Sequence, residues 1–209
     1  MTHFIDITRP LTENLISWPG RLPPEHHWDK SIAQGDHCNA SFWKMSAHSG
    51  THMDAPLHFI EGGRAIDQIP PDVFIGVCTV IDLPAMNCLV MDDTLASQFR
   101  GEKRLLIRTH HSDAGSDVIY QPHDALLTSE AASILIDGGL MLIGTDRLSV
   151  DDSTGADHAL HHLLLKASCV IVEGLHLAKV TPGRYSLIAA PLRLTGKEAS
   201  PVRALLFEI

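Results

Sequence analysis

An eleven-residue block, HSGTHMDAPLH at residues 48–58, constrains the local fold more than any other segment of this chain. Gly50 is a weak helix residue, and Pro56 lacks an amide hydrogen and disfavours helical geometry at the residue before it. These two residues argue against a continuous helix. We therefore expect a strand that runs into a loop.

Polar side chains of metal-binding type are evenly spaced along this block. His48, His52, Asp54 and His58 are separated by four, two and four positions. In an extended chain, residues an even number of positions apart face the same side. Imidazole nitrogens and a carboxylate oxygen suit zinc, manganese or iron, whereas calcium and magnesium sites are built mainly of oxygens. A single histidine is more often a packing or surface residue, but four aligned groups predict a metal site.

The length and charge of the chain limit its organisation and its partners. No composition shift or linker divides the chain, so we expect residues 1–209 to form a single domain. With 16 basic and 25 acidic residues, the formal charge of −9 argues against nucleic acid or an anionic membrane surface and favours a small-molecule partner. The N-terminal MTHFIDITRPL has no leader-like run and no segment has the length of a membrane span, so we expect a cytoplasmic location.

Short apolar runs, many of them β-branched, predict strands at residues 4–7, 75–83, 105–109, 140–143, 170–172, 187–190 and 202–207. Helices are expected at about 128–136, where Ser129 and Glu130 suit a first turn, and at about 156–166. The predicted fold class is therefore an α/β domain rich in strands.

Several other kinds of site are excluded by the motifs. The cysteines, which are Cys38, Cys78, Cys88 and Cys169, show no CxxC pairing, so we expect neither disulfides nor cysteine ligands. A GxSxG nucleophile turn and the Gly-rich phosphate loops are absent from the sequence. A serine hydrolase or a nucleotide-binding enzyme is therefore not favoured.

A second cluster supplies further candidate ligands. Glu173 ends an apolar run in SCVIVEGLH, where a buried carboxylate needs either a cationic side chain or a metal ion beside it. The candidate helix HALHHLLLKAS carries His161 and His162, and either could point from the edge of its apolar face toward Glu173. Spacing alone leaves this choice open.

Motifs along nearly the whole chain resemble the cyclase family of metal-dependent hydrolases and, within it, the bacterial kynurenine formamidases. They are DITRPL, WPG at 18–20, HSGTHMDAPLHF, IGTDRLSVD at 143–151, the twelve-residue step to Glu173, EGLHL, and the tail PGRYSLIAAPLRLTGKEASPVRALL. The resemblance implies a swivelling β/β/α fold and assembly as a homo-oligomer, either a dimer or a tetramer.

The resemblance also implies a centre of two divalent metal ions per subunit, with zinc favoured over manganese. By position, His48, His52 and Asp54 would hold the first ion, and Asp54, His161 and Glu173 the second, with both carboxylates bridging. The twelve-residue step selects His161 over His162 only through this resemblance.

The implied activity is hydrolysis of N-formylkynurenine to kynurenine and formate by a metal-activated water. His58 would be the general acid/base, since histidine exchanges protons near neutral pH, and Trp18 would line the substrate pocket. An alternative is hydrolysis of another small amide, lactam or lactone, as in isatin hydrolases. Another is a metal-dependent small-molecule binding protein without turnover, although such a protein would not need the proton donor His58.

The chain departs from the formamidase pattern beside the expected second ion. Gly155 and Ala156 stand where a Ser-Lys pair is typical, and Arg147 occupies a position that usually has no arginine. Arg147 could receive a substrate carboxylate, or form a surface or structural salt bridge, which is the commoner role.

The remaining histidines have no comparable spacing and are interpreted as surface, structural or supporting groups. They include His26, His27, His110, His111, His123, His158, His162 and His176. Metal-bound histidine usually donates its other ring nitrogen to a partner, and Asp146 is a candidate for that role.

Overall fold

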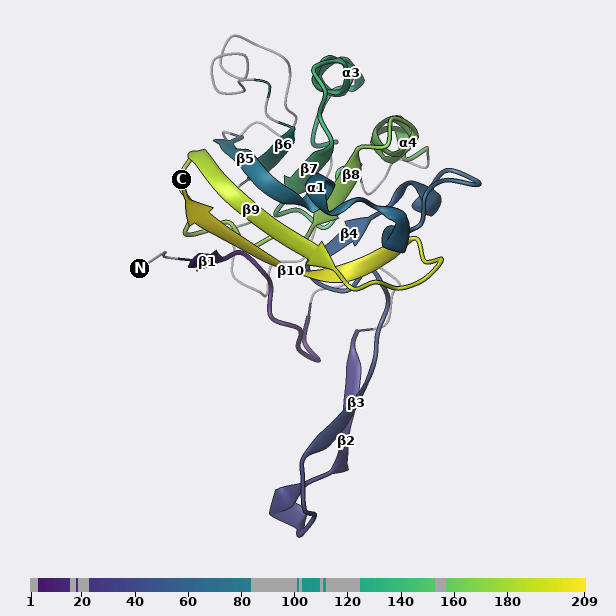
Figure 1. Ribbon diagram of the computed structural model, residues 1–209, viewed down its shortest axis with the longest axis vertical. Helices are drawn as coiled ribbons and strands as arrows, with labels where there is room; N and C mark the ends of the chain where they lie inside the picture. Colours follow the sequence, from purple (N-terminus) through teal and green to yellow (C-terminus); the bar gives the residue numbers. More distant parts are fainter. Residues whose placement is uncertain are drawn as a thin grey trace.

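The structure is a computed structural model that describes residues 4–15, 18, 23–83, 101, 103–109, 111, 125–152 and 157–209. Its body is a strongly curved mixed sheet with two helices on its outer side, and a long hairpin projects from the body (Figure 1). In the part of the chain so described, none of the helices has the length and apolar character that crossing a membrane requires.

The strands of the body pair into a closed ring. In order around the ring they are β10 (Ala199–Glu208), β4 (His52–Asp54), β8 (Val170–Glu173), β7 (Leu142–Thr145), β6 (Arg104–Arg108), β5 (Ile75–Asp82) and β9 (Gly183–Pro191), which pairs again with β10. Strand β1 (Phe4–Asp6) adds to the edge of β10. The expected swivelling β/β/α fold is thus confirmed, although β7 begins two residues later than predicted.

Alternating side chains of these strands build two separate hydrophobic cores. In β6, Leu106 packs inside the ring, while Leu105 and Ile107 pack on its outer side beneath the helices. The same alternation places Leu142 inside and Ile143 outside in β7. Burial on both faces is why these strands are continuous apolar runs in the sequence.

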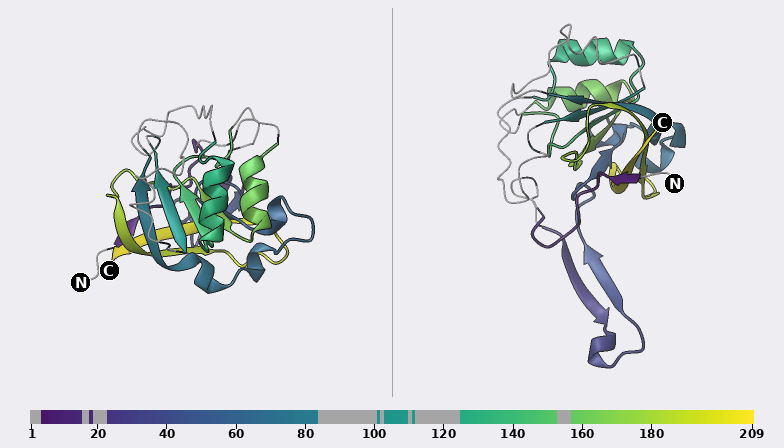
Figure 2. Two further views of the ribbon diagram at one scale, coloured as in Figure 1. Left: turned by 90° about the horizontal axis from the view of Figure 1, so that it is seen from above. Right: turned by 90° about the vertical axis from the view of Figure 1, so that its left-hand side faces the viewer.

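Two helices cover the outer face of the parallel part of the sheet, as Figure 2 shows. Helix α3 spans Ser129–Asp137, and the Thr128 hydroxyl caps it by accepting the Ala131 amide hydrogen. Helix α4 spans Ala159–Lys166, so it starts later than predicted, and Ala156 lies outside the described residues. The shorter elements are α1 (Pro71–Phe74), η1 (Ile32–Gln34), η2 (Pro56–His58) and η3 (Ile66–Gln68).

A hairpin that the sequence did not predict extends away from the body (Figures 1 and 2). It consists of β2 (Glu25–Lys30) and β3 (Ala40–Lys44), which pair with one another. Trp28, Phe42 and Trp43 on this hairpin are 59%, 55% and 40% exposed. The hairpin lacks a hydrophobic core of its own among the described residues.

Three of the four cysteines lie within the described residues. Cys38, Cys78 and Cys169 are free, and Cys88 lies outside the described residues. Cys78 and Cys169 are buried in the two cores, and burial raises the pKa of Cys169.

Candidate metal centre

Two neighbouring antiparallel strands bring the first groups of the site together. Met53 packs inside the ring, so His52 and Asp54, on either side of it in β4, face outward toward the helices. His52 lies directly opposite Glu173, the last residue of β8. His52 Nε2 is 3.4 Å from Glu173 Oε2 and 3.6 Å from Asp54 Oδ1.

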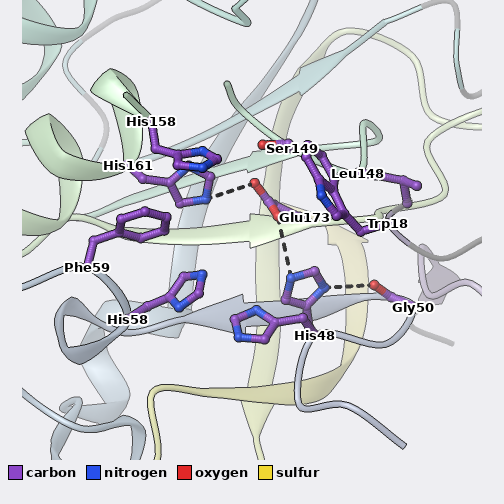
Figure 3. A pocket seen from close by; sticks show the side chains of 11 residues that line it. Trp18, His48, Gly50, His58, Phe59, Leu148, Ser149, His158, His161 and Glu173 are labelled. Carbon is purple, nitrogen blue, oxygen red and sulfur yellow. Dashed lines mark hydrogen bonds and ion pairs between the residues drawn. The ribbon is translucent and has the colours of Figure 1, made fainter. Parts of the chain in front are cut away.

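Helix α4 brings His161 over these strands from the other side. His161 Nε2 is 3.4 Å from Glu173 Oε1 and 3.6 Å from Asp54 Oδ2 (Figure 3). Each of the two carboxylates therefore presents one oxygen to His52 and the other oxygen to His161. All four side chains are buried.

The geometry of these groups fits divalent metal ions. Ligand distances of about 2.0–2.2 Å in a tetrahedral arrangement place neighbouring donor atoms about 3.4 Å apart, close to the four distances above. Within the described residues, neither oxygen of the buried Asp54 carboxylate has a hydrogen-bond partner of acceptable geometry. A buried carboxylate in that state is costly unless a cation meets it. His52, Asp54 and Glu173 have ligand atoms close enough together to share an ion.

Hydrogen bonds hold both histidine rings with Nε2 toward the carboxylates. The Nδ1 atom of His52 lies 2.9 Å from the Gly50 carbonyl oxygen, and the Nδ1 atom of His161 lies 2.6 Å from Asp151 Oδ2. If Nδ1 carries the hydrogen in each ring, Nε2 keeps a lone pair for a metal ion. The acidic group found beside His161 is thus Asp151, whereas the predicted candidate Asp146 accepts hydrogen bonds from Thr109.

Without a metal ion, the buried carboxylates raise the pKa values of their histidine neighbours. Burial by itself lowers the pKa of His161, but its hydrogen bond to Asp151 and its close contacts with Asp54 and Glu173 outweigh burial and raise that pKa to about 12. The pKa of His52 is also raised, because Asp54 and Glu173 overcome the effect of burial. The pKa of Asp54 lies well below its ordinary value for the reciprocal reason.

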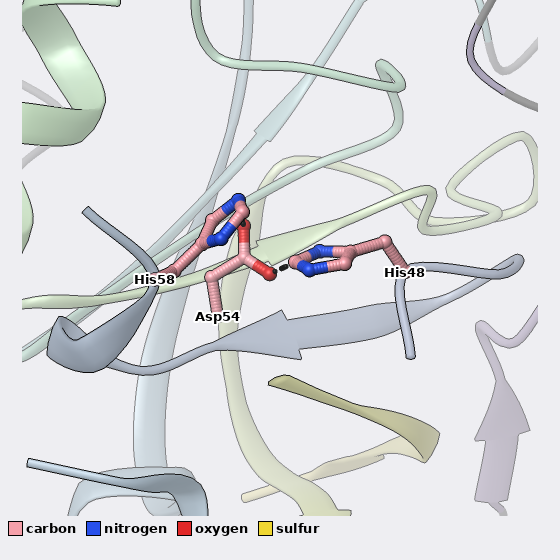
Figure 4. A group of neighbouring side chains, drawn as sticks. All are labelled: His48, Asp54 and His58. Atoms are coloured by element: carbon pink, nitrogen blue, oxygen red, sulfur yellow. Dashed lines mark ion pairs between the residues drawn. The ribbon is translucent and has the colours of Figure 1, made fainter. Parts of the chain in front are cut away.

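His48 and His58 lie on either side of the Asp54 carboxylate (Figure 4). His48 Nδ1 is 2.8 Å from Asp54 Oδ1, although the contact is misaligned for a hydrogen bond, and His58 Nε2 is 4.0 Å from Asp54 Oδ2. Burial is the main effect on His58 and lowers its pKa to about 4. His58 is therefore neutral at pH 7 and can accept a proton. Ligand atoms of His48, Asp54 and His58 lie close enough together to share an ion. The distances therefore also allow His58 to be a metal ligand.

A cavity of about 170 Å³ opens above these groups. A void of roughly 150 Å³ is enough to hold a benzene ring. The residues that line it are His48, Gly50, His52, His58, His161 and Glu173, together with Trp18, Phe59, Leu148, Ser149 and His158. Phe59 lies on one side of Glu173, and Trp18 and Leu148 lie on the other (Figure 3). The cavity therefore offers both apolar surface for an aromatic ring and polar groups beside it.

The structure resolves part of what spacing left open. His161 is the buried histidine beside Glu173, whereas His162 is exposed and contacts Phe59 with its ring. Arg147 is only 4% exposed, which excludes a salt bridge on the surface. It is also absent from the described residues that line the cavity. Gly155 and Ala156 lie outside the described residues, as do His110 and His123.

His158 and Phe59 are cavity residues that spacing did not identify. His158 was interpreted as a surface, structural or supporting group, but it lines the cavity. Phe59 directly follows His58, and its ring contacts four histidines, which are His58, His158, His161 and His162. The adjacency of Phe59 to the metal-type block was the available signal. His158 had none, because its position depends on a local backbone turn.

Gly174 is required where β8 leaves the site. Its φ of +67° is in the left-handed region, and a Cβ atom there would lie 2.5 Å from the Gly50 carbonyl oxygen. Thr51 Oγ1 donates to the Gly174 carbonyl oxygen at 2.7 Å. This close contact fixes the 50–51 turn, and hence the carbonyl that orients His52, against the end of β8.

The closed sheet and its outer cluster of histidines and carboxylates define the class of metal-binding α/β proteins with a small-molecule cavity. The chain belongs to the family described as putative cyclase, whose model matches residues 5–152. It is 35% identical over 206 residues to the kynurenine formamidase of Bacillus cereus, covering 98% of this chain and 97% of that protein.

Solved structures agree over the full length. A predicted metal-dependent hydrolase from Bacillus stearothermophilus is 30% identical with a TM-score of 0.85, covering 100% of both chains. Isatin hydrolase A from Labrenzia aggregata, bound to benzyl benzoate, is 26% identical with a TM-score of 0.85, covering 99% of this chain and 94% of its own.

Proposed function

We propose that this protein is a metal-dependent hydrolase of small aryl amides and that N-formylkynurenine is its leading substrate. The observation that carries the proposal is the arrangement of Asp54 and Glu173, each with one oxygen facing His52 and the other facing His161. The similarity to kynurenine formamidases over almost the whole chain supports the choice of substrate.

The proposed cofactor is a pair of divalent ions, with zinc favoured over manganese. His48, His52 and Asp54 would hold the first ion, and Asp54, His161 and Glu173 the second, with both carboxylates between them. When bound, such ions supply a Lewis acid and bring the pKa of water to about 7. The two carboxylates offset only about half of the added positive charge, which leaves the site suited to an anionic transition state.

His58 is the proposed proton carrier. Its neutral ring would take a proton from water as the water oxygen attacks the formyl carbon. It would then give that proton to the aryl nitrogen as the C–N bond breaks, because an anilide is a poor leaving group as an anion. The products are the arylamine and formate. The lowered pKa of His58, about 4, supports the first of these steps, since the ring enters the reaction unprotonated.

The apolar side chains of the cavity would contact the aryl ring. The ring would lie against Phe59 with its amide at His58, while Trp18 and Leu148 line the cavity on the other side of Glu173. In such a cavity the apolar walls select the size of the substrate ring, and individual polar side chains recognise the polar substituents of the substrate.

The test is turnover by protein loaded with two equivalents of zinc, and separately of manganese, with metal content measured. N-formylkynurenine is offered beside isatin, formanilide and a small lactone. Rapid release of kynurenine and formate supports the proposal. Activity on isatin alone would indicate that the substrate is a lactam. This is the second candidate function, and the similarity to isatin hydrolase A favours it. Metal binding without turnover of any substrate would instead indicate a binding protein.

We also propose that the protein is a homo-oligomer, a dimer or a tetramer, held by the β2–β3 hairpin docking on a second copy. An isolated two-stranded hairpin is marginally stable in water, and an exposed apolar patch usually marks an interface. Trp28 and Trp43, which lie on the same face of the hairpin, supply that patch. Sedimentation of wild type should give a dimer or larger, and the Trp28→Ser/Trp43→Ser double variant should give a monomer. Leu192→Ser, at an equally exposed apolar position in the loop after β9, is the control. A monomeric wild type at micromolar concentration would refute the assembly.

The cytoplasm is the location proposed for this enzyme. The free thiols of Cys38, Cys78 and Cys169 are compatible with a reducing compartment. Fractionation of cells that express the tagged chain, with a periplasmic marker as control, tests the location.

A further inference from the structure

His158 occupies an unusual place at the start of helix α4. Its backbone is left-handed, with φ 44° and ψ 46°, and among the described residues only Ser168 shares a positive φ without being glycine. For a residue with a Cβ atom, this conformation costs about 1–2 kcal/mol. Such an outlier beside a cavity is a reason to look for a role in ligand binding.

Its imidazole is not used to cap the helix. His158 is the residue before the first turn, where a side chain usually accepts an amide hydrogen, but it makes no such bond. Asp151 does so instead, because its carboxylate accepts the amide hydrogens of Leu160 at 2.8 Å and His161 at 3.1 Å. The ring of His158 therefore takes no part in capping the helix.

The contacts of that ring are aromatic rather than polar. Its centroid is 5.2 Å from that of Phe59 and 6.1 Å from that of His161. Among the described residues, neither ring nitrogen has a hydrogen bond or an ion pair. Asp151, His158 and His161 are near enough to share an ion, but the 2.6 Å bond from His161 Nδ1 already engages Asp151. A neutral imidazole has one N–H donor and one acceptor nitrogen, and both remain open to a ligand.

The ring also lies at a useful place in the cavity. Phe59 contacts both His58 and His158, and Figure 3 shows these two histidines on either side of Phe59. An aryl ring against Phe59, with its amide at the His58 end, would direct a neighbouring substituent toward His158.

We propose that His158 is a specificity residue that donates a hydrogen bond to an oxygen acceptor next to the amide of the substrate. The class of substrate it selects is an aryl amide with a carbonyl group ortho to the amide nitrogen. This inference depends on the proposed function for its reaction, but binding can test it alone.

The experiment compares 2-formamidoacetophenone, which has the ortho carbonyl, with formanilide, which lacks it. Loss of one hydrogen bond should lower kcat/KM of His158→Ala about 3- to 10-fold for the first substrate and leave the second unchanged. His158→Asn should retain most of the preference, since asparagine tolerates left-handed backbone and keeps a donor. His162→Ala is the matched control, because His162 also contacts Phe59 with its ring but is exposed and does not line the cavity.

Equal loss on both substrates, or loss of bound metal in His158→Ala, would overturn the proposal and leave a structural role. If metal-loaded wild type hydrolyses neither these compounds nor N-formylkynurenine, the proposed function fails. In that case, or if the two compounds alone are not hydrolysed, dissociation constants for 2-aminoacetophenone and aniline test the role of His158. A preference for the ketone that His158→Ala abolishes supports it. A preference that persists in the variant refutes it.

Discussion

The Nδ1 atom of His161 and the Oδ2 atom of Asp151 lie 2.6 Å apart, and this contact links the candidate metal centre to the start of helix α4. The same carboxylate accepts two amide hydrogens from the first turn of that helix. One residue therefore fixes the position of the helix, the orientation of the His161 ring and the nitrogen that faces Asp54 and Glu173.

Asp151→Asn should weaken metal binding without preventing folding. An amide can keep one helix contact, but it cannot hold the His161 ring as strongly with Nδ1 protonated. Loss of such a supporting carboxylate typically lowers metal affinity 10- to 100-fold. Competition with a chromophoric chelator measures the change, and Asp157→Asn, an exposed acid near the same helix end, is the control. Unchanged affinity in Asp151→Asn would show that the contact serves only the helix.

His58→Ala separates the proton carrier from the ligands. If His58 moves a proton, the variant keeps two equivalents of metal and loses about 10²- to 10⁴-fold in kcat. If it is a ligand, metal is lost together with activity. Metal analysis of the dialysed protein beside single-turnover rates distinguishes these results, and His26→Ala on the distant hairpin is the control.

Protonation of His58 should reduce activity only at unusually low pH. His58 must be neutral to accept a proton, and burial lowers its pKa to about 4. A fall in activity near pH 7 is expected from metal-bound water, whose pKa is about 7. A second fall that depends on His58 should appear only near pH 4, whereas an ordinary histidine is half protonated at about pH 6.5. Rates of wild type and His58→Ala at saturating metal, with metal content checked at each pH, separate the two. A limb near pH 6.5 that is present in wild type and absent from His58→Ala would contradict the low pKa of His58.

Most of the body could be predicted because its strands are short apolar runs buried on both faces. The hairpin β2–β3 could not, because EHHWDK and ASFWK mix charged and aromatic residues, and their side chains find no core within the chain described. The predicted start of α4 was early because His158 takes a left-handed turn that no helix periodicity encodes.

For the site, even spacing correctly placed His52 and Asp54 on one face of β4, but His48 lies in a turn before the strand and His58 lies in η2, so the extended-chain argument does not apply to them. Spacing also could not supply the partners of β4. His52 and Glu173 meet only because β4 pairs with β8, a long-range register that local sequence does not determine. The resemblance to a family predicted Glu173 as a partner of the β4 residues. It did not predict the contact between Asp151 and His161, or the direction in which His158 points.

Metal binding should release protons at pH 7, at least one of them from His161. In the metal-free protein the pKa of His161 is raised to about 12, so its ring is protonated at neutral pH, and the pKa of His52 is raised as well. An ion must displace the hydrogen on the Nε2 atom of His161, and this holds until the pH rises toward that raised value. Zinc titration calorimetry in buffers of different ionisation enthalpy gives the proton count as the slope. Binding heats that do not depend on the buffer would show that the histidines are already neutral.

Gly174→Ala should damage both stability and the metal centre, for two separable reasons. The left-handed backbone costs any alanine about 1–2 kcal/mol. At Gly174 the new Cβ atom would also lie 2.5 Å from the Gly50 carbonyl oxygen, which orients His52. Gly139→Ala is the matched control, since φ there is +90° and nothing lies within 4 Å of the added atom. Urea unfolding should show a larger loss for Gly174→Ala, and only that variant should bind zinc more weakly. Equal losses with intact zinc affinity would mean that the turn at Gly50 yields freely and does not position His52.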